Sequence, residues 1–196
     1  MKRLVYYIAL TLIVAQLIVV LTSWMLSATL TEGVRSLISA EGLRWFVGGF
    51  SHILLTPQLS WLLLGAMAAG CASRSGIAKL LRWPKDYRQQ LAFRLTTALL
   101  LLSVAVVALL ALAPHAVLLS ATGHLWPSPF SDALIPLAAL TTIVASAAYG
   151  LTVQRFSHVS DVFQSLIAGL SAAAPLLLLY IFFTQLFFSL CYVFYW

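Results

Sequence analysis

Residues 126–187 read WPSPFSDALIPLAALTTIVASAAYGLTVQRFSHVSDVFQSLIAGLSAAAPLLLLYIFFTQLF, and they contain two long apolar runs separated by a short polar loop. The first run, at about 133–153, has Pro136 near its start, where proline costs a helix little because the first turn has free N–H groups. Each run is long enough for a transmembrane helix, which needs roughly 20 apolar residues. The loop contains Gln154, Arg155, His158 and Asp161. This stretch predicts a membrane hairpin with a short return.

The whole chain has the composition of a membrane protein. Of its 196 residues, 62% are hydrophobic and 8% are charged, whereas soluble domains carry roughly 25% charged residues. We therefore predict an all-α integral membrane protein that forms one transmembrane domain over residues 1–196. At roughly 20 residues per crossing, this length fits about five transmembrane helices. The apolar runs place them at about 4–30, 52–72, 95–113, 133–153 and 162–196.

The basic residues predict the orientation of these spans. The first span follows Lys2 and Arg3, and only Arg35 and Arg44 fall on the opposite side. The positive-inside rule then places the N-terminus in the cytoplasm and the C-terminus outside. The other basic residues on the predicted cytoplasmic side are Arg74, Lys79, Arg82, Lys85, Arg88, Arg94 and Arg155. We expect a multi-pass protein of the bacterial inner (cytoplasmic) membrane.

The net charge of +6 does not indicate a nucleic-acid-binding protein. The basic residues flank apolar runs, whereas a phosphate-binding face would gather them on one soluble surface. The first apolar run also differs from a signal peptide, because it is far longer than the ~7–15 residues of a signal core and lacks an Ala-x-Ala site. We expect the lipid bilayer to be the main partner and predict that this run is retained as a span.

Two segments depart from a simple crossing. Residues 31–45 alternate apolar and charged residues at helical spacing, which predicts an interfacial amphipathic helix on the outer leaflet. Residues 162–196 form a run of 35 residues, too long for one span and too short for two with a loop. Pro175 and the small residues before it predict that this last helix is bent or broken. The expected division is a partly polar approach up to Ala174 and a full crossing from Pro175.

The second span carries small residues at four-residue spacing. Gly65 pairs in this way with Ala69, and Ala66 with Gly70. Small residues let helix backbones approach closely in lipid. We predict that these four residues pack against another helix, either within the chain or in a second copy.

The sequence gives no sign of an enzyme. The histidines stand alone in or near loops, with no Cys, Asp or Glu at the spacing that metal ligands need. We therefore expect no catalytic residue, no metal site and no cofactor. Polar side chains inside the spans are instead the candidates for substrate binding, and they are Ser146, Tyr149 and Gln185. A buried amide in lipid needs a partner, which suggests a pair between Gln16 and Gln185. Arg155 and Asp161 could pair across the hairpin loop.

Several short motifs follow one another along the chain: Ala40–Trp45 (AEGLRW), Ser128-Pro129-Phe130, Ile135-Pro136-Leu137, Tyr149-Gly150, Asp161-Val162 and Phe182–Phe187 (FFTQLF). In this order and at this spacing they resemble the motifs of the AbgT family, the p-aminobenzoyl-glutamate and antimetabolite transporters. The second span, which ends in Ser75-Gly76, and the basic third span are also similar to spans of that family. The resemblance covers nearly the whole chain.

The resemblance implies membrane transport of p-aminobenzoyl-glutamate or a similar small anion by a homodimer. Full-length members of the family have about nine spans and two re-entrant hairpins per subunit, and the hairpins bind the substrate. This chain resembles only the scaffold spans, because residues 73–94 lead directly from the second span to the equivalent of the family's fifth. A second membrane subunit could supply the rest. The alternative is a non-transporting scaffold or interaction subunit that dimerises or assembles with another membrane protein.

Overall fold

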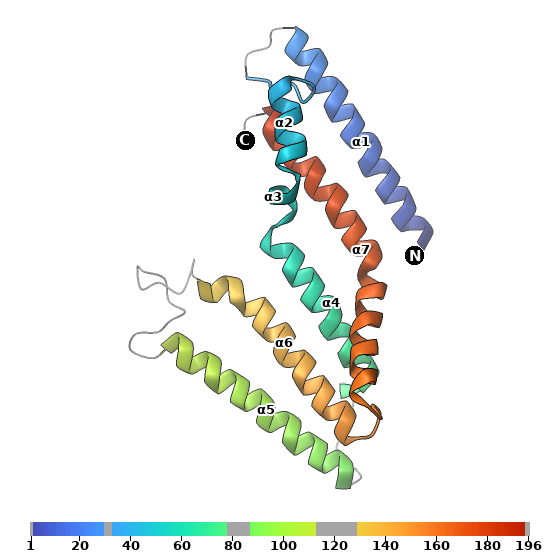
Figure 1. Cartoon of the computed structure of the whole chain (residues 1–196), viewed down its shortest axis with the longest axis vertical. Helices are drawn as coiled ribbons and strands as arrows, with labels where there is room; N and C mark the ends of the chain where they lie inside the picture. The colour runs from blue at the N-terminus through green and yellow to red at the C-terminus, as the bar shows by residue number, and fades with distance from the viewer. Residues whose placement is uncertain (1, 30–32, 78–86, 113–128, 195–196) are drawn as a thin grey trace. The chain divides into compact units, whose positions relative to one another are not determined.

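A computed structural model describes residues 2–29, 33–77, 87–112 and 129–194 (Figure 1). Within these ranges the ordered elements are all helices. They are α1 (Lys2–Ala28), α2 (Ala40–Gly48), α3 (Phe50–Leu54), α4 (Pro57–Ser75), α5 (Tyr87–Leu112), α6 (Pro129–Thr152) and α7 (Val159–Phe194). The prediction of an all-α membrane protein is confirmed.

Four of the described helices are long and apolar enough to cross a membrane, namely α1, α5, α6 and α7. Helix α4 is not among these four. It has 19 residues but is more polar, with Gln58 and Ser60 at its start and Arg74 near its end. It corresponds to the second predicted span, at about 52–72. The sequence predicts about five spans. By length and apolarity alone, four of the described helices qualify as membrane spans.

The second predicted span differs from the structure at its start. The apolar run predicts one span from about residue 52, but α3 ends at Leu54 and α4 begins at Pro57. The residue before a proline disfavours the helical conformation, and proline itself suits the first position of a helix. Pro57 therefore starts a helix and separates it from α3.

The third predicted span begins earlier than expected. The apolar run starts at about residue 95, but α5 begins at Tyr87 and includes Arg88 and Arg94. Charged residues at the end of a span do not interrupt a helix, because arginine is a good helix former. The basic residues Lys79, Arg82 and Lys85 lie outside the described residues, as do Trp126, Pro127 and Ser128.

The interfacial helix is shorter than the segment 31–45 predicted for it. The described part of this segment is not helical before Ala40, where α2 begins. The side chain of Ser39 accepts a hydrogen bond from the Gly42 N–H at 3.0 Å and caps the helix. Upstream, the Arg35 N–H donates to the Val193 carbonyl at 3.1 Å. Because the Arg35 N–H is bonded to this distant carbonyl, it cannot form the hydrogen bond that a longer helix would require of it.

The chain divides into two compact units, and the first contains residues 1–59 and 174–196. In this unit α1 is joined to the C-terminal part of α7, where the Gln16 Nε2 donates to the Ser189 Oγ at 2.9 Å. Trp45 of α2 stacks on Tyr192 of α7 with ring centroids 4.4 Å apart. The described part of the predicted interfacial segment is thereby held against the end of α7.

The second unit contains residues 60–173, and so most of α4, all of α5 and α6, and the first part of α7. Helices α5 and α6 run in opposite directions and pack against each other (Figure 1). The last helix, α7, contains Pro175 and still extends from Val159 to Phe194 as one element. The boundary between the units falls between Ala173 and Ala174. The expected division at Pro175 is therefore a boundary between packing units and does not interrupt the helix.

Two of the small residues of α4 lie directly against α7. A Cβ added to Gly70 would lie 2.5 Å from the Ser165 carbonyl oxygen and closer still to the Gly169 backbone. A Cβ added to Gly169 would in turn collide with the Ala66 carbonyl oxygen. By contrast, a Cβ added to Gly65 would meet no atom within 4 Å. The face with Ala66 and Gly70 thus packs within the chain, and a contact of Gly65 and Ala69 with a second copy stays a prediction.

This difference between two glycines of one helix can be measured. We expect Gly70→Ala to destabilise the protein by roughly 1–3 kcal/mol, because the added methyl group overpacks the contact with α7. Gly65→Ala is the matched control and should raise the stability by about 0.5–1 kcal/mol, the usual gain from replacing a helical glycine. Thermal unfolding in detergent measures both. Equal shifts for the two variants would contradict the α4–α7 contact.

Candidate functional site

The three substrate-binding candidates fall into the two different units. Ser146 and Tyr149 lie on α6 in the second unit, three residues apart and both buried. Gln185 lies on α7 in the first unit and is also buried. Ser146 and Tyr149 therefore share one face of α6. Gln185 is a separate buried polar residue in the other unit.

The second unit contains two buried hydroxyl groups that lack a partner. Ser146 of α6 and Thr96 of α5 are both 0% exposed. Within the described residues, neither hydroxyl oxygen has a hydrogen-bond partner. Because buried polar groups in native proteins are nearly always hydrogen-bonded, this pair is unusual.

The two hydroxyl groups lie on α5 and α6, which pack against each other. The side chain of Arg88 donates to the Gln154 Oε1 and links the start of α5 to the turn after α6. Thr96 follows Arg88 by eight residues, and Ser146 precedes Gln154 by eight. The pair forms a buried polar layer, defined here as Thr96 and Ser146.

Reasoning from the sequence missed Thr96, because Thr96 and Thr97 look alike in an apolar run. The signal lies in the helical spacing, since Ala92 and Thr96 are four residues apart and both fully buried. Thr97 instead donates its hydroxyl hydrogen to the Phe93 carbonyl of its own helix at 2.7 Å. Only the helix face therefore distinguishes the two threonines.

In the first unit, the Gln185 amide is 6% exposed, and neither its oxygen nor its nitrogen has a partner among the described residues. The pair expected with Gln16 is not formed. Gln16 donates to Ser189, and the Ser189 hydroxyl donates to the Gln185 carbonyl of the backbone at 2.7 Å. The hydroxyl of Ser189 can reach both groups because it lies one helical turn beyond Gln185.

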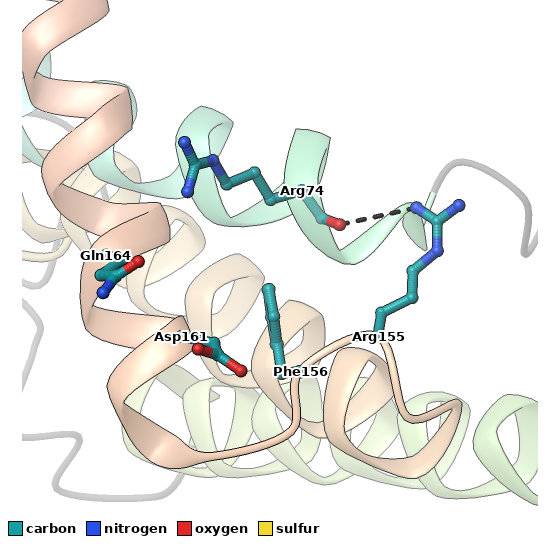
Figure 2. A pocket seen from close by; sticks show the side chains of 5 residues that line it. All are labelled: Arg74, Arg155, Phe156, Asp161 and Gln164. Atoms are coloured by element: carbon teal, nitrogen blue, oxygen red, sulfur yellow. Dashed lines mark hydrogen bonds between the residues drawn. The ribbon is translucent and has the colours of Figure 1, made fainter.

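At one end of the second unit, side chains from three elements surround a hollow of about 310 Å³ (Figure 2). They come from the end of α4, the α6–α7 loop and the first turns of α7. We call this hollow the arginine hollow. Its lining residues are Arg74, Arg155, Phe156, Asp161 and Gln164.

A tight helix ending places the loop side chains in the arginine hollow. Gln154 has a left-handed backbone with φ 58°. The Arg155 N–H bonds the Gly150 carbonyl at 2.8 Å, and the Gln154 N–H bonds the Leu151 carbonyl at 3.1 Å. These two bonds are those of a Schellman motif, which satisfies the last carbonyls of a helix. The ring of Phe156 then lies against Gly150, where a Cβ would collide with it.

Arg155 and Asp161 both line the arginine hollow but bond to backbone groups, so the pair expected between them is not formed. The Asp161 Oδ2 accepts the N–H groups of Ser157 at 2.7 Å and His158 at 3.1 Å. Asp161 is the third residue of α7, and an acid at this position can accept hydrogen bonds from N–H groups at the start of its helix. The Arg155 Nη1 donates to the Arg74 carbonyl at 3.5 Å (Figure 2). Among the residues described, no ion pair joins the two side chains.

Metal chemistry finds no support in the described ranges. No group of three His, Cys, Asp or Glu side chains within them could hold a metal ion. His115 and His124 lie outside the described residues. The chemistry that the described site residues offer is therefore hydrogen bonding inside the helix pairs and positive charge at the arginine hollow.

The chain was compared with models of known protein families. The model of the AbgT putative transporter family matches residues 82–193, which is more than half of the chain. The match includes α5 and α6 and nearly all of α7. No curated protein and no solved structure matched the chain.

The unpartnered hydroxyl of Thr96 has a measurable consequence. An unsatisfied buried polar group costs about 1–3 kcal/mol, so we expect Thr96→Val to leave the stability unchanged or raise it by about 1 kcal/mol. The neighbouring variant Thr97→Val removes a hydroxyl that is already bonded within its helix and serves as the control. Thermal unfolding in detergent compares them. A clear loss of stability in Thr96→Val alone would show that this hydroxyl has a structural partner.

Proposed function

Because the chain belongs to the AbgT putative transporter family, we propose that it carries a small aryl-glutamate anion, such as p-aminobenzoyl-glutamate, across the bacterial inner membrane. The observation that carries this proposal is the family match over residues 82–193. Helices α5, α6 and α7, which the match covers, are each long and apolar enough to span a bilayer.

The buried polar layer supports a role in substrate contact. An aryl-glutamate has an amide, an aromatic amine and two carboxylates, so its passage needs hydrogen-bonding groups inside the protein. Polar groups within transmembrane bundles are expensive and mark functional positions. Thr96 and Ser146 offer hydroxyl groups that no described residue uses. We assign them to the substrate path, with Tyr149 one turn further along α6.

The same argument applies to Gln185 in the first unit. Its amide can donate and accept hydrogen bonds at once, and both atoms lack a partner within the described part of the chain. An amide of this kind suits the amide of an aryl-glutamate. We assign Gln185 a substrate contact that is independent of the buried polar layer.

The protein is proposed to act as a homodimer or with a second membrane subunit. Large apolar side chains of α1 are exposed in the single chain, among them Leu10, Leu17, Leu21 and Trp24. Such a face suits lipid or a neighbouring transmembrane helix. This surface also favours the second candidate function, a non-transporting scaffold that dimerises or assembles with another membrane protein.

Uptake into liposomes separates the two functions. We expect liposomes that contain only the purified protein to accumulate labelled p-aminobenzoyl-glutamate when a proton or sodium gradient is applied. Empty liposomes and liposomes without a gradient are the controls. A folded, dimeric preparation that shows no uptake would contradict transport by this chain alone and favour the scaffold.

Variants of the buried polar layer test its part in transport. Loss of one hydrogen bond of about 1 kcal/mol predicts a roughly fivefold fall in uptake rate for Thr96→Val and for Ser146→Ala. Thr97→Val and Ser103→Ala are the matched controls, because their hydroxyls bond carbonyls of their own helix at 2.7 and 2.8 Å. The controls should keep the wild-type rate. Equal rates in all four variants would remove the layer from the substrate path.

A further inference from the structure

The arginine hollow carries more positive than negative charge. Arg74 and Arg155 are both exposed at its rim, and Asp161 is the acid that lines it. One oxygen of Asp161 already accepts two backbone N–H groups. The hollow therefore attracts an anion. Guanidinium groups bind the oxygens of phosphate and carboxylate through paired N–H groups, which makes arginine the usual residue for such ligands.

The side chain of Arg155 is held in place before any ligand arrives. The Schellman motif fixes its backbone, and its Nη1 donates to the Arg74 carbonyl at 3.5 Å. Its guanidinium also lies against Gly76, which has a left-handed backbone with φ 70°. A Cβ at Gly76 would collide with this guanidinium. The glycine thus leaves the space that the arginine occupies.

The position of the hollow indicates the source of the anion. Arg155 and Phe156 lie in the loop between α6 and α7, both of which are candidate membrane spans. The hollow is therefore at a membrane edge, on the side that the basic residues predict to be cytoplasmic. Basic pockets between transmembrane helices on that side bind the headgroups of anionic lipids.

An apolar surface continues from the hollow along α7. Gln164 lines the hollow, and its neighbours Phe163 and Ile167 are 61% and 63% exposed. A lipid with its phosphate in the hollow could lay an acyl chain over this surface, whereas a free anion would gain nothing from it. We propose that the arginine hollow binds the headgroup of an anionic phospholipid, with Arg155 on one side of it and Arg74 on the other. This site is independent of the proposed transport function.

The test compares lipid binding by the full chain in detergent. We expect native mass spectrometry to retain phosphatidylglycerol on the wild-type protein and to lose phosphatidylcholine under the same conditions. The double variant Arg74→Gln/Arg155→Gln should retain phosphatidylglycerol at least about tenfold less, since it removes both positive charges of the arginine hollow. The double variant Arg44→Gln/Arg94→Gln makes the same change in net charge away from the hollow and should retain the lipid as the wild type does.

A second pair of variants changes no charge. Gly76→Ala should displace the Arg155 guanidinium and weaken retention, while Gly33→Ala is the matched control. Gly33 also has a left-handed backbone, with φ 91°, but an added Cβ there would meet no atom within 4 Å. This pair keeps the test decisive if the double arginine variant does not fold.

Three results would overturn the proposal. Equal retention of phosphatidylglycerol and phosphatidylcholine would exclude a headgroup site. Equal losses in the hollow variants and their controls would show that net charge or backbone strain alone governs binding. Displacement of the lipid by millimolar inorganic phosphate would identify a free anion as the ligand, because an acyl chain on α7 should keep the lipid bound.

Discussion

A bilayer interior contains no water to bond a peptide N–H or carbonyl group, and each described helix of this protein meets that constraint. A helix satisfies its backbone internally, so the apolar runs of the sequence become helices whatever they pack against. The constraint also explains the backbone between the helices. Gln154 takes a left-handed conformation so that the last carbonyls of α6 are bonded, and Asp161 bonds the N–H groups at the start of α7.

Side chains are subject to the same constraint, and most hydroxyl groups satisfy it locally. Thr11, Thr22, Thr97 and Thr142 each donate to the carbonyl four residues earlier in their own helix. Thr96, Ser146 and Gln185 do not, although each is buried and each has a polar atom without a partner among the described residues. A protein that only needed stable spans would place apolar side chains there. This contrast within one set of helices is why the proposed substrate contacts centre on these residues.

The two kinds of site have different physical requirements. Inside the helix pairs, the buried polar atoms without a partner among the described residues belong to neutral side chains. A charge in the bilayer interior costs far more free energy than a hydroxyl or an amide. At the membrane edge, Arg74 and Arg155 keep their charges exposed. A transporter of an anionic substrate has a use for both, and an anionic lipid at the edge would fix α4, the loop and α7 at one point.

The sequence by itself determined the class of protein, the hairpin of α6 and α7 and the candidates Ser146, Tyr149 and Gln185. Those features depend on composition and on local spacing along one helix. Only the tertiary structure decided that Gly70 and not Gly65 meets α7, that Ser189 and not Gln185 bonds Gln16, and that Thr96 and not Thr97 is fully buried. Each of these facts depends on residues far apart in the chain. They depend on how a helix is rotated about its axis and on the register in which it packs against another helix. The helical repeat of the sequence does not determine the rotation or the register.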